Sequence, residues 1–147
     1  VLEGIAAEVQ RDRFKGKLWA TARGLHNWPD TPENKAFVER FKKRWIRFPN
    51  YSAETTYSAF FIMKAAVEKS RSMETAKVIE GLKGMQIMQA GGLRVFRAED
   101  QQFIYNVPAG RPMMDPKYPI PVLGDLKVFD AKDYYRHPPF TPVAATK

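Results

Sequence analysis

Apolar residues at helical spacing between positions 31 and 45 predict an amphipathic helix. Phe37, Phe41 and Trp45 recur at i, i+4 and i+8, which places the three rings on one stripe. Thr31 is expected to cap the helix, because its hydroxyl can accept from a backbone amide of the first turn. Pro32 then occupies the first helical position, where its missing N–H costs nothing.

Two more helices are predicted between positions 52 and 83. Ser52 is expected to cap the first of them, which runs to about Lys69 and carries so few polar residues that we expect it to be mostly buried. Ser72 is expected to cap the second, over 73–83. Gly84 follows where a left-handed residue commonly ends a helix.

A helix over 1–13 and a short strand over 17–22 are predicted before these helices, and extended segments after them. Met85 to Ala90 is expected to be irregular or extended, and Gly91-Gly92 to form a turn. The runs 93–96 and 102–107 flank a turn and therefore predict a β-hairpin.

The sequence changes character at Pro108. Six of the 11 prolines lie between Pro108 and Pro138, and we expect a proline-rich extended tail from this point. Residues 126–129 are expected to form one more strand. Residues 132–142 are expected to be extended, and 143–147 frayed.

Composition indicates an ordinary globular protein. The chain has 147 residues, of which 44% are hydrophobic and 27% charged, and it contains no cysteine and therefore no disulfide. No apolar run approaches the roughly 18 residues that a membrane-spanning helix needs. The net charge is +8, but the longest basic run is Lys42-Lys43-Arg44, so we expect a solvated face and no nucleic-acid partner.

The residues of common catalytic and metal sites are not grouped. His26 and His137 are too far apart in sequence to form a zinc-binding pair, and no glycine-rich phosphate loop is present. Glu99 and Asp100 are adjacent in a predicted turn, so their carboxylates diverge and do not suit paired acid–base chemistry. We therefore expect no enzyme activity, no metal and no cofactor.

The order of the central elements is similar to that of a known family. A helix at 34–45, a helix opening at 53–59, a helix ending at 78–84 and a hairpin at 91–102 resemble the C-terminal part of a type 1 periplasmic substrate-binding protein of an ABC transporter, in the branched-chain amino acid-binding branch. This implies a partial α/β fold, in which three-layer α/β/α lobes are joined by hinge strands and the N-terminal part is missing. Residues 1–107 would then belong to the two-lobe fold, and 108–147 would form a proline-rich extended tail packed on the lobes.

The resemblance also suggests ligand-binding residues. One contact position of the family falls on Ser52, with Tyr51 beside it; the alternative is that Ser52 only caps the helix. In the loop after the first strand, His26 and Trp28 suit a contact at the wall of a ligand cleft. The alternative is that Trp28 packs on the domain edge while His26 lies in solvent.

The function implied is that of a periplasmic solute-binding protein whose precursor carries a signal peptide. It would capture a small amino acid or an aromatic carboxylate by hinge closure and deliver it to a membrane permease. The implied partners are the ligand, the permease and an N-terminal fragment of the same protein, without which this chain should aggregate. The alternative is a ligand-sensing domain of the same fold in a signalling protein.

Overall fold

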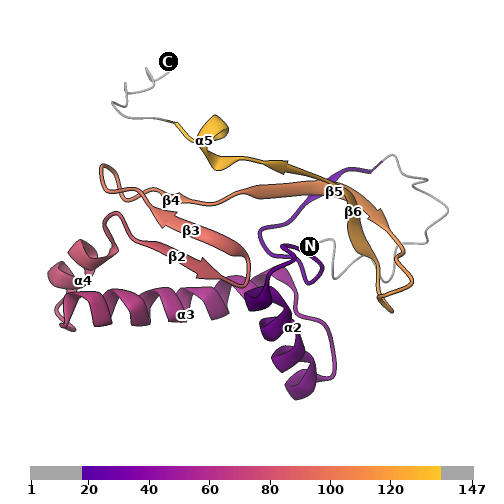
Figure 1. Ribbon diagram of the computed structural model, residues 1–147, viewed down its shortest axis with the longest axis horizontal. Helices are drawn as coiled ribbons and strands as arrows, with labels where there is room; N and C mark the ends of the chain where they lie inside the picture. The colour runs from indigo at the N-terminus through magenta and orange to yellow at the C-terminus, as the bar shows by residue number, and fades with distance from the viewer. Residues whose placement is uncertain (1–17, 137–147) are drawn as a thin grey trace, which may run out of the picture.

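The computed structural model describes residues 18–136, which form a mixed α/β structure. Its elements are β1 (Ala20–Thr21), α2 (Pro32–Trp45), α3 (Tyr51–Ser70), α4 (Thr75–Leu82), β2 (Gln86–Gln89), β3 (Gly92–Phe96), β4 (Phe103–Ile104), β5 (Val107–Met113), β6 (Val122–Phe129) and α5 (Ala131–Tyr134). These strands form two antiparallel sheets, ordered β1-β5-β6 and β2-β3-β4. Helix α3 runs alongside the second sheet, and β5 and β6 extend away from α4 as a long ribbon (Figure 1).

Helix α2 has the predicted limits and the predicted cap. The Thr31 hydroxyl accepts from the amide of Asn34 at 3.3 Å, and Pro32 is the first helical residue. The apolar stripe begins in the core at Phe37, which is buried, but at Trp45 it has left the core, since 54% of that side chain is exposed. Its last turn therefore projects beyond the packed part of the molecule.

Two predictions for helix α3, its cap and its burial, are wrong. Its cap is Asn50, whose side chain accepts from the amide of Ala53 at 2.9 Å, and Ser52 lies inside the first turn. The helix is also not mostly buried. One face is buried along Glu54, Ser58, Ile62 and Ala66, whereas Phe60, Phe61 and Met63 are exposed. The error arises because α3 carries apolar residues on all its sides. Its sequence therefore does not show which side is covered, and only the neighbouring elements determine it.

Helix α4 is shorter than the predicted 73–83. Its cap is Glu74, and the Ser72 hydroxyl accepts from the Glu74 amide at 3.1 Å. The predicted left-handed conformation of Gly84 is confirmed by a φ of 67°. Helices α3 and α4 approach closely at Gly81, where an added Cβ would lie 2.8 Å from the carbonyl oxygen of Ala66.

The β2-β3-β4 sheet extends the predicted hairpin. The strands over 93–96 and 102–107 are confirmed in part, because Val95 pairs with Ile104 and Phe96 with Phe103, but β4 is only two residues long. The segment predicted as irregular or extended contains β2, which pairs with β3. The turn between them is Ala90-Gly91, one residue before the predicted Gly91-Gly92.

The β1-β5-β6 sheet contains the main departure from the sequence pattern. Strand β1 is shorter than the predicted 17–22 within the described residues. Strand β5 was not predicted because it contains Pro108 and Pro112, yet it is the central strand. Pro108 is fully buried, and its carbonyl oxygen accepts from the Thr21 hydroxyl at 2.8 Å. Tertiary burial therefore outweighs the missing backbone donors.

The C-terminal predictions are confirmed only in part. The strand predicted at 126–129 is the end of β6, but the extended segment predicted from Lys132 begins within α5. The side chain of Asp130 caps α5 by accepting from the Lys132 amide at 3.1 Å. The division at residues 107 and 108 stays a prediction and falls after the first residue of β5. The predictions for 1–13, for the end of the extended segment at 137–142 and for 143–147 lie outside the described residues.

Within residues 18–136, buried apolar residues form three small clusters instead of one core. Their centres are Ala20, Leu25 and Leu123; Phe37, Val38 and Ala90; and Ala66, Val78 and Met85. Across residues 18–136, no helix is both long and apolar enough to cross a membrane.

Candidate ligand-binding site

The loop that carries His26 and Trp28 is fixed at both ends by side-chain amides. Asn34, in the first turn of α2, donates to the carbonyl oxygens of Leu25 at 3.1 Å and Pro29 at 3.0 Å. Asn27 donates to the carbonyl oxygen of Leu123 in β6 at 2.9 Å. The loop is therefore held between α2 and the β1-β5-β6 sheet.

His26 lies in an aromatic environment and not in solvent. Only 7% of the residue is exposed, and its ring centroid lies 4.9 Å from that of Phe48 and 5.2 Å from that of Tyr118. Within residues 18–136, neither ring nitrogen has a hydrogen-bond partner. Burial lowers the pKa of His26 to about 4, so the imidazole is neutral at pH 7 and offers one donor and one acceptor.

Trp28 belongs to a different cluster. It is half-buried and packs against Ala20, Leu25 and Leu123. The packing agrees with the alternative that Trp28 lies on the domain edge. The structure therefore places His26 and Trp28 in one loop but gives their rings different neighbours, and a role for Trp28 in ligand binding stays a prediction.

Tyr51 and Ser52 are the first two residues of α3, where Tyr51 is half-buried and Ser52 is exposed. The interpretation of Ser52 as a simple cap is wrong, because Asn50 has that role. Phe48 connects this segment to His26, since it precedes Tyr51 by three residues and contacts the imidazole. A role in ligand binding stays a prediction for both residues.

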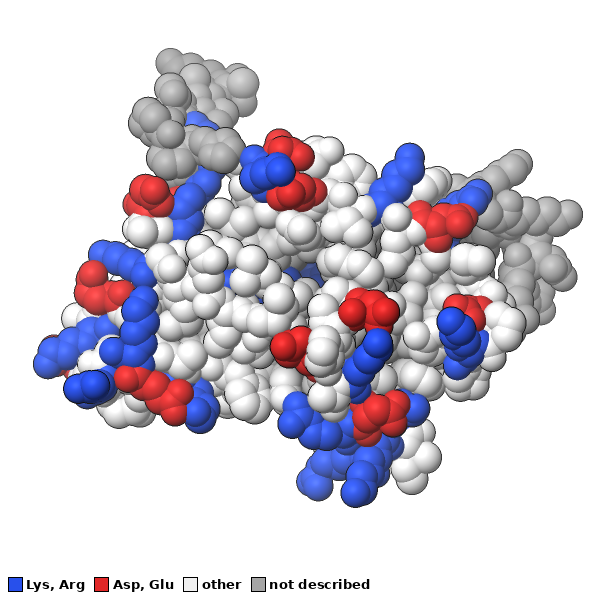
Figure 2. Space-filling model, viewed as in Figure 1, with Lys and Arg blue, Asp and Glu red and all other residues white. Residues whose placement is uncertain are grey.

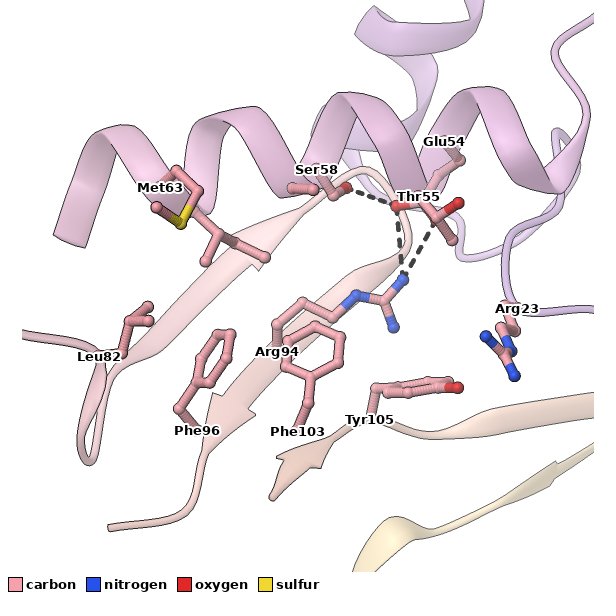
Figure 3. A pocket seen from close by; sticks show the side chains of 12 residues that line it. Arg23, Glu54, Thr55, Ser58, Met63, Leu82, Arg94, Phe96, Phe103 and Tyr105 are labelled. Carbon is pink, nitrogen blue, oxygen red and sulfur yellow. Dashed lines mark hydrogen bonds and ion pairs between the residues drawn. The ribbon is translucent and has the colours of Figure 1, made fainter. Parts of the chain in front are cut away.

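A buried polar network behind the first turn of α3 was missed by the sequence analysis. Glu54 Oε1 accepts from the Ser58 hydroxyl at 2.6 Å (Figure 3). It also accepts from the Gly91 amide at 2.9 Å. Both carboxylate oxygens of Glu54 lie 3.4 Å from Nη2 of Arg94, and both side chains are 3% exposed. No local pattern predicts this pair, because its members are 40 positions apart.

A cavity of about 390 Å³ adjoins this network, between α3 and the strands β3 and β4. Apolar side chains from both sides line most of it, including Met63, Leu82, Phe96 and Phe103 (Figure 3). Ile62 also lines it. The Arg94 guanidinium carbon lies 4.8 Å from the ring centroid of Tyr105. Glu54 balances the charge of Arg94, and Arg23 adds a second cation to walls that are otherwise mainly apolar.

Metal chemistry finds no support in this part of the chain. Among residues 18–136, no group of three or more histidine, aspartate or glutamate side chains could hold a metal ion. The carboxylates of Asp30, Glu39 and Asp125 instead pair with Lys35, Lys42 and Arg111.

Comparison with known proteins assigns the family. Residues 6–112 match the periplasmic binding protein family, and the chain therefore belongs to that family. It is a family of binding proteins and not of enzymes. No curated protein matches the chain.

Solved structures show the same relationship. A branched-chain amino acid transporter protein from Rhodopseudomonas palustris is 25% identical with a TM-score of 0.69, over 79% of this chain and 31% of that one. A solute-binding protein from the same species, solved with 3,4-dihydroxybenzoic acid, is 19% identical with a TM-score of 0.70. The match covers 78% of this chain and 31% of that one. A leucine-binding protein from Thermotoga maritima is 21% identical with a TM-score of 0.62. The match covers 79% of this chain and 31% of that one. At these identities, the last two show a shared fold.

The chain spans about a third of the length of these relatives. The described residues therefore correspond to part of a type 1 periplasmic binding fold. This agrees with the resemblance inferred from the sequence.

Proposed function

We propose that this chain is part of the solute-binding component of an ABC importer, located in the periplasm, which captures an amino acid or an aromatic carboxylate. The family assignment supports a binding protein, and the solved relatives include one named for leucine and one solved with 3,4-dihydroxybenzoic acid. Hinge closure of the complete two-lobe fold would retain the ligand, and the closed form would deliver it to a permease.

The observation that carries the proposed site is the environment of His26. A neutral imidazole whose nitrogens have no partner among residues 18–136 lies between the rings of Phe48 and Tyr118. Unpaired buried polar atoms are costly, so such a group commonly meets a ligand, water or another segment of protein. A donor flanked by aromatic rings suits the carboxylate and ring of a small aromatic or amino acid.

The charge state of His26 limits its role. With a pKa of about 4 the imidazole is neutral at pH 7, so it can donate a hydrogen bond to a carboxylate but cannot neutralise it. The segment Tyr51–Ser52 begins α3, and helix N-termini attract anions through their amides and dipole. We infer that His26 and Trp28 line one side of the site and Tyr51 and Ser52 the other.

The exposed face of α3 supports a partner from the same protein. Phe60 is 73% exposed, and Phe61 and Met63, on its two flanks, are 43% and 49% exposed; exposed large apolar side chains favour a contact surface. The solved relatives are about three times longer than their matched part. We propose that an N-terminal fragment of the protein covers this face and completes the three-layer lobes, with the precursor bearing a signal peptide.

Titration calorimetry on the intact protein that contains these residues tests the proposed site. The panel consists of leucine, phenylalanine, 4-hydroxybenzoate and 3,4-dihydroxybenzoate at pH 7.5. His26→Phe keeps an aromatic ring but removes both nitrogens, and we expect it to weaken binding at least about 10-fold, the equivalent of one hydrogen bond to a charged group. Thr56→Ala, an exposed change on α3, is the matched control.

Two results would contradict the proposal. Absence of binding to every member of the panel would count against the ligand class. Binding that His26→Phe and Thr56→Ala leave equally strong would show that the site lies elsewhere in the protein.

A further inference from the structure

The C-terminal end of α2 exposes apolar and basic side chains together. We define the α2 tip as Lys43, Arg44, Trp45, Ile46 and Arg47. Trp45 is 54% exposed and Ile46 94%, and the three basic side chains around them are also exposed. No acidic residue occurs between Arg40 and Ala53. Figure 2 shows lysine and arginine side chains gathered at the lower edge of the molecule, where α2 ends in Figure 1.

The conformation of Ile46 makes its exposure more informative. This residue caps α2 with φ 55° and ψ 28°, a left-handed conformation that β-branched side chains rarely adopt. Glycine usually occupies such a position. Since 94% of Ile46 is exposed, its side chain does not offset that cost by packing within the described structure. Its apolar surface is therefore available for a contact beyond the described residues.

We propose that the α2 tip binds the surface of an anionic phospholipid bilayer. Tryptophan is favoured at the boundary between headgroups and acyl chains, because its ring is large and apolar while its N–H remains hydrated. Ile46 adds an apolar group at the same end of the helix, and Lys43, Arg44 and Arg47 supply cations for phosphate headgroups. The guanidinium of Arg44 lies 5.2 Å from the ring centroid of Trp45, so charge and apolar surface are adjacent.

The small size of the tip favours a membrane over a protein partner. A stable protein interface uses about 20–30 residues from each side. The tip offers five residues at a projecting helix end, which can enter a soft headgroup layer without a complementary surface. An acidic protein partner is the competing outcome. The inference does not depend on which ligand the protein carries.

Vesicle co-sedimentation of the intact protein tests this surface. The probes are vesicles of 30% phosphatidylglycerol in phosphatidylcholine and vesicles of phosphatidylcholine alone. We expect binding only to the anionic vesicles and weaker binding as salt is raised. Replacing Lys43, Arg44 and Arg47 with glutamine should weaken binding on the order of 100-fold, since each basic residue near such a surface contributes roughly a five-fold factor.

A charge-matched variant separates the tip from the overall charge. Lys64, Lys77 and Lys127 are exposed lysines outside the tip. Replacing them with glutamine removes the same number of positive charges and leaves the tip unchanged. This control should bind nearly as well as the parent. Equal weakening in both triple variants would overturn the proposal, because net charge alone would then explain binding.

Ile46→Gly gives two readouts of opposite sign. Glycine adopts the left-handed conformation without steric cost, so we expect the melting temperature to rise by about 2–8 °C. Vesicle binding should weaken in the same variant. A lower melting temperature would show that Ile46 has a structural contact and would overturn the inference.

The fluorescence of Trp45 completes the test. Anionic vesicles should shift the emission of the intact protein to shorter wavelength, and Trp45→Phe should abolish the shift while Trp19 and Trp28 remain. Failure of the intact protein to bind vesicles, with Trp45 shielded from a soluble quencher, would show that protein covers the tip and would also overturn the proposal. Because no solute is used, these outcomes are independent of the ligand titrations.

Discussion

Replacing Glu54 with glutamine tests whether the buried network fixes α3 to the β2-β3 hairpin. Glu54 joins α3 to the turn at Gly91 through one hydrogen bond and to β3 through Arg94. Glutamine has nearly the same size and keeps an oxygen that can accept from the Gly91 amide. It removes the negative charge, so the Arg94 guanidinium is left buried without its counter-ion.

The expected loss follows from the geometry of the pair. At the 3.4 Å separation of Arg94 Nη2 and Glu54 Oε2, with an effective dielectric constant near 20, the attraction is about 5 kcal/mol. Both side chains are 3% exposed, so water does not replace the missing charge. Breaking such a buried pair from one side costs about 3–5 kcal/mol. We expect Glu54→Gln to lower the free energy of unfolding by that amount.

The assay is urea unfolding of the intact protein at pH 7, followed by circular dichroism. Glu68→Gln is a matched control, because it is the same change on the same helix in an exposed pair with Lys64. That control should lose no more than about 1 kcal/mol. A loss for Glu54→Gln no larger than for Glu68→Gln would refute the reasoning.

A double-mutant cycle separates the pair from local packing. Arg94→Met removes the cation while keeping an unbranched apolar chain. In the double variant with Glu54→Gln, the total loss should fall short of the sum of the single losses by about 1–3 kcal/mol. Strict additivity would show that the two charges do not stabilise each other.

Three further predictions concern His26, the α3 cap and the β5–β6 contact. The folded pKa of His26, about 4, lies below its usual 6.5, so protonation favours the unfolded chain. Stability present above pH 6.5 should fall by about 3 kcal/mol as the pH drops to 4, and His26→Phe should remove this component in urea titrations at several pH values. Asn50→Ala should cost about 1 kcal/mol by thermal unfolding and Ser52→Ala less than about 0.5 kcal/mol; equal losses would contradict the assigned cap. Gly110→Ala places a Cβ 2.5 Å from the carbonyl oxygen of Gly124 and should cost about 1–3 kcal/mol, whereas an unchanged melting temperature would contradict this contact.

The sequence by itself determined that helices lie near α2, α3 and α4 and in which order, and it determined the cap of α2. Thr31, Pro32 and the spacing of Phe37 and Phe41 specify α2 through contacts within a few positions of the chain. Gly84 likewise ends the α4 region because a local steric limit decides which residue can adopt its φ. The order of these elements was also enough to suggest the family that the comparison assigns.

Only the tertiary structure decided which faces are covered and which distant residues meet. Pro108 argues locally against a strand, but pairing with β6 and burial beside β1 make it part of the central strand. His26, predicted as a wall contact or a solvated side chain, becomes a neutral buried group because Phe48 and Tyr118 pack against it. The sequence pattern assigned no role to Glu54 or Arg94. Their pairing depends on a fold that brings positions 40 apart into contact, where exclusion of water makes each charge require the other.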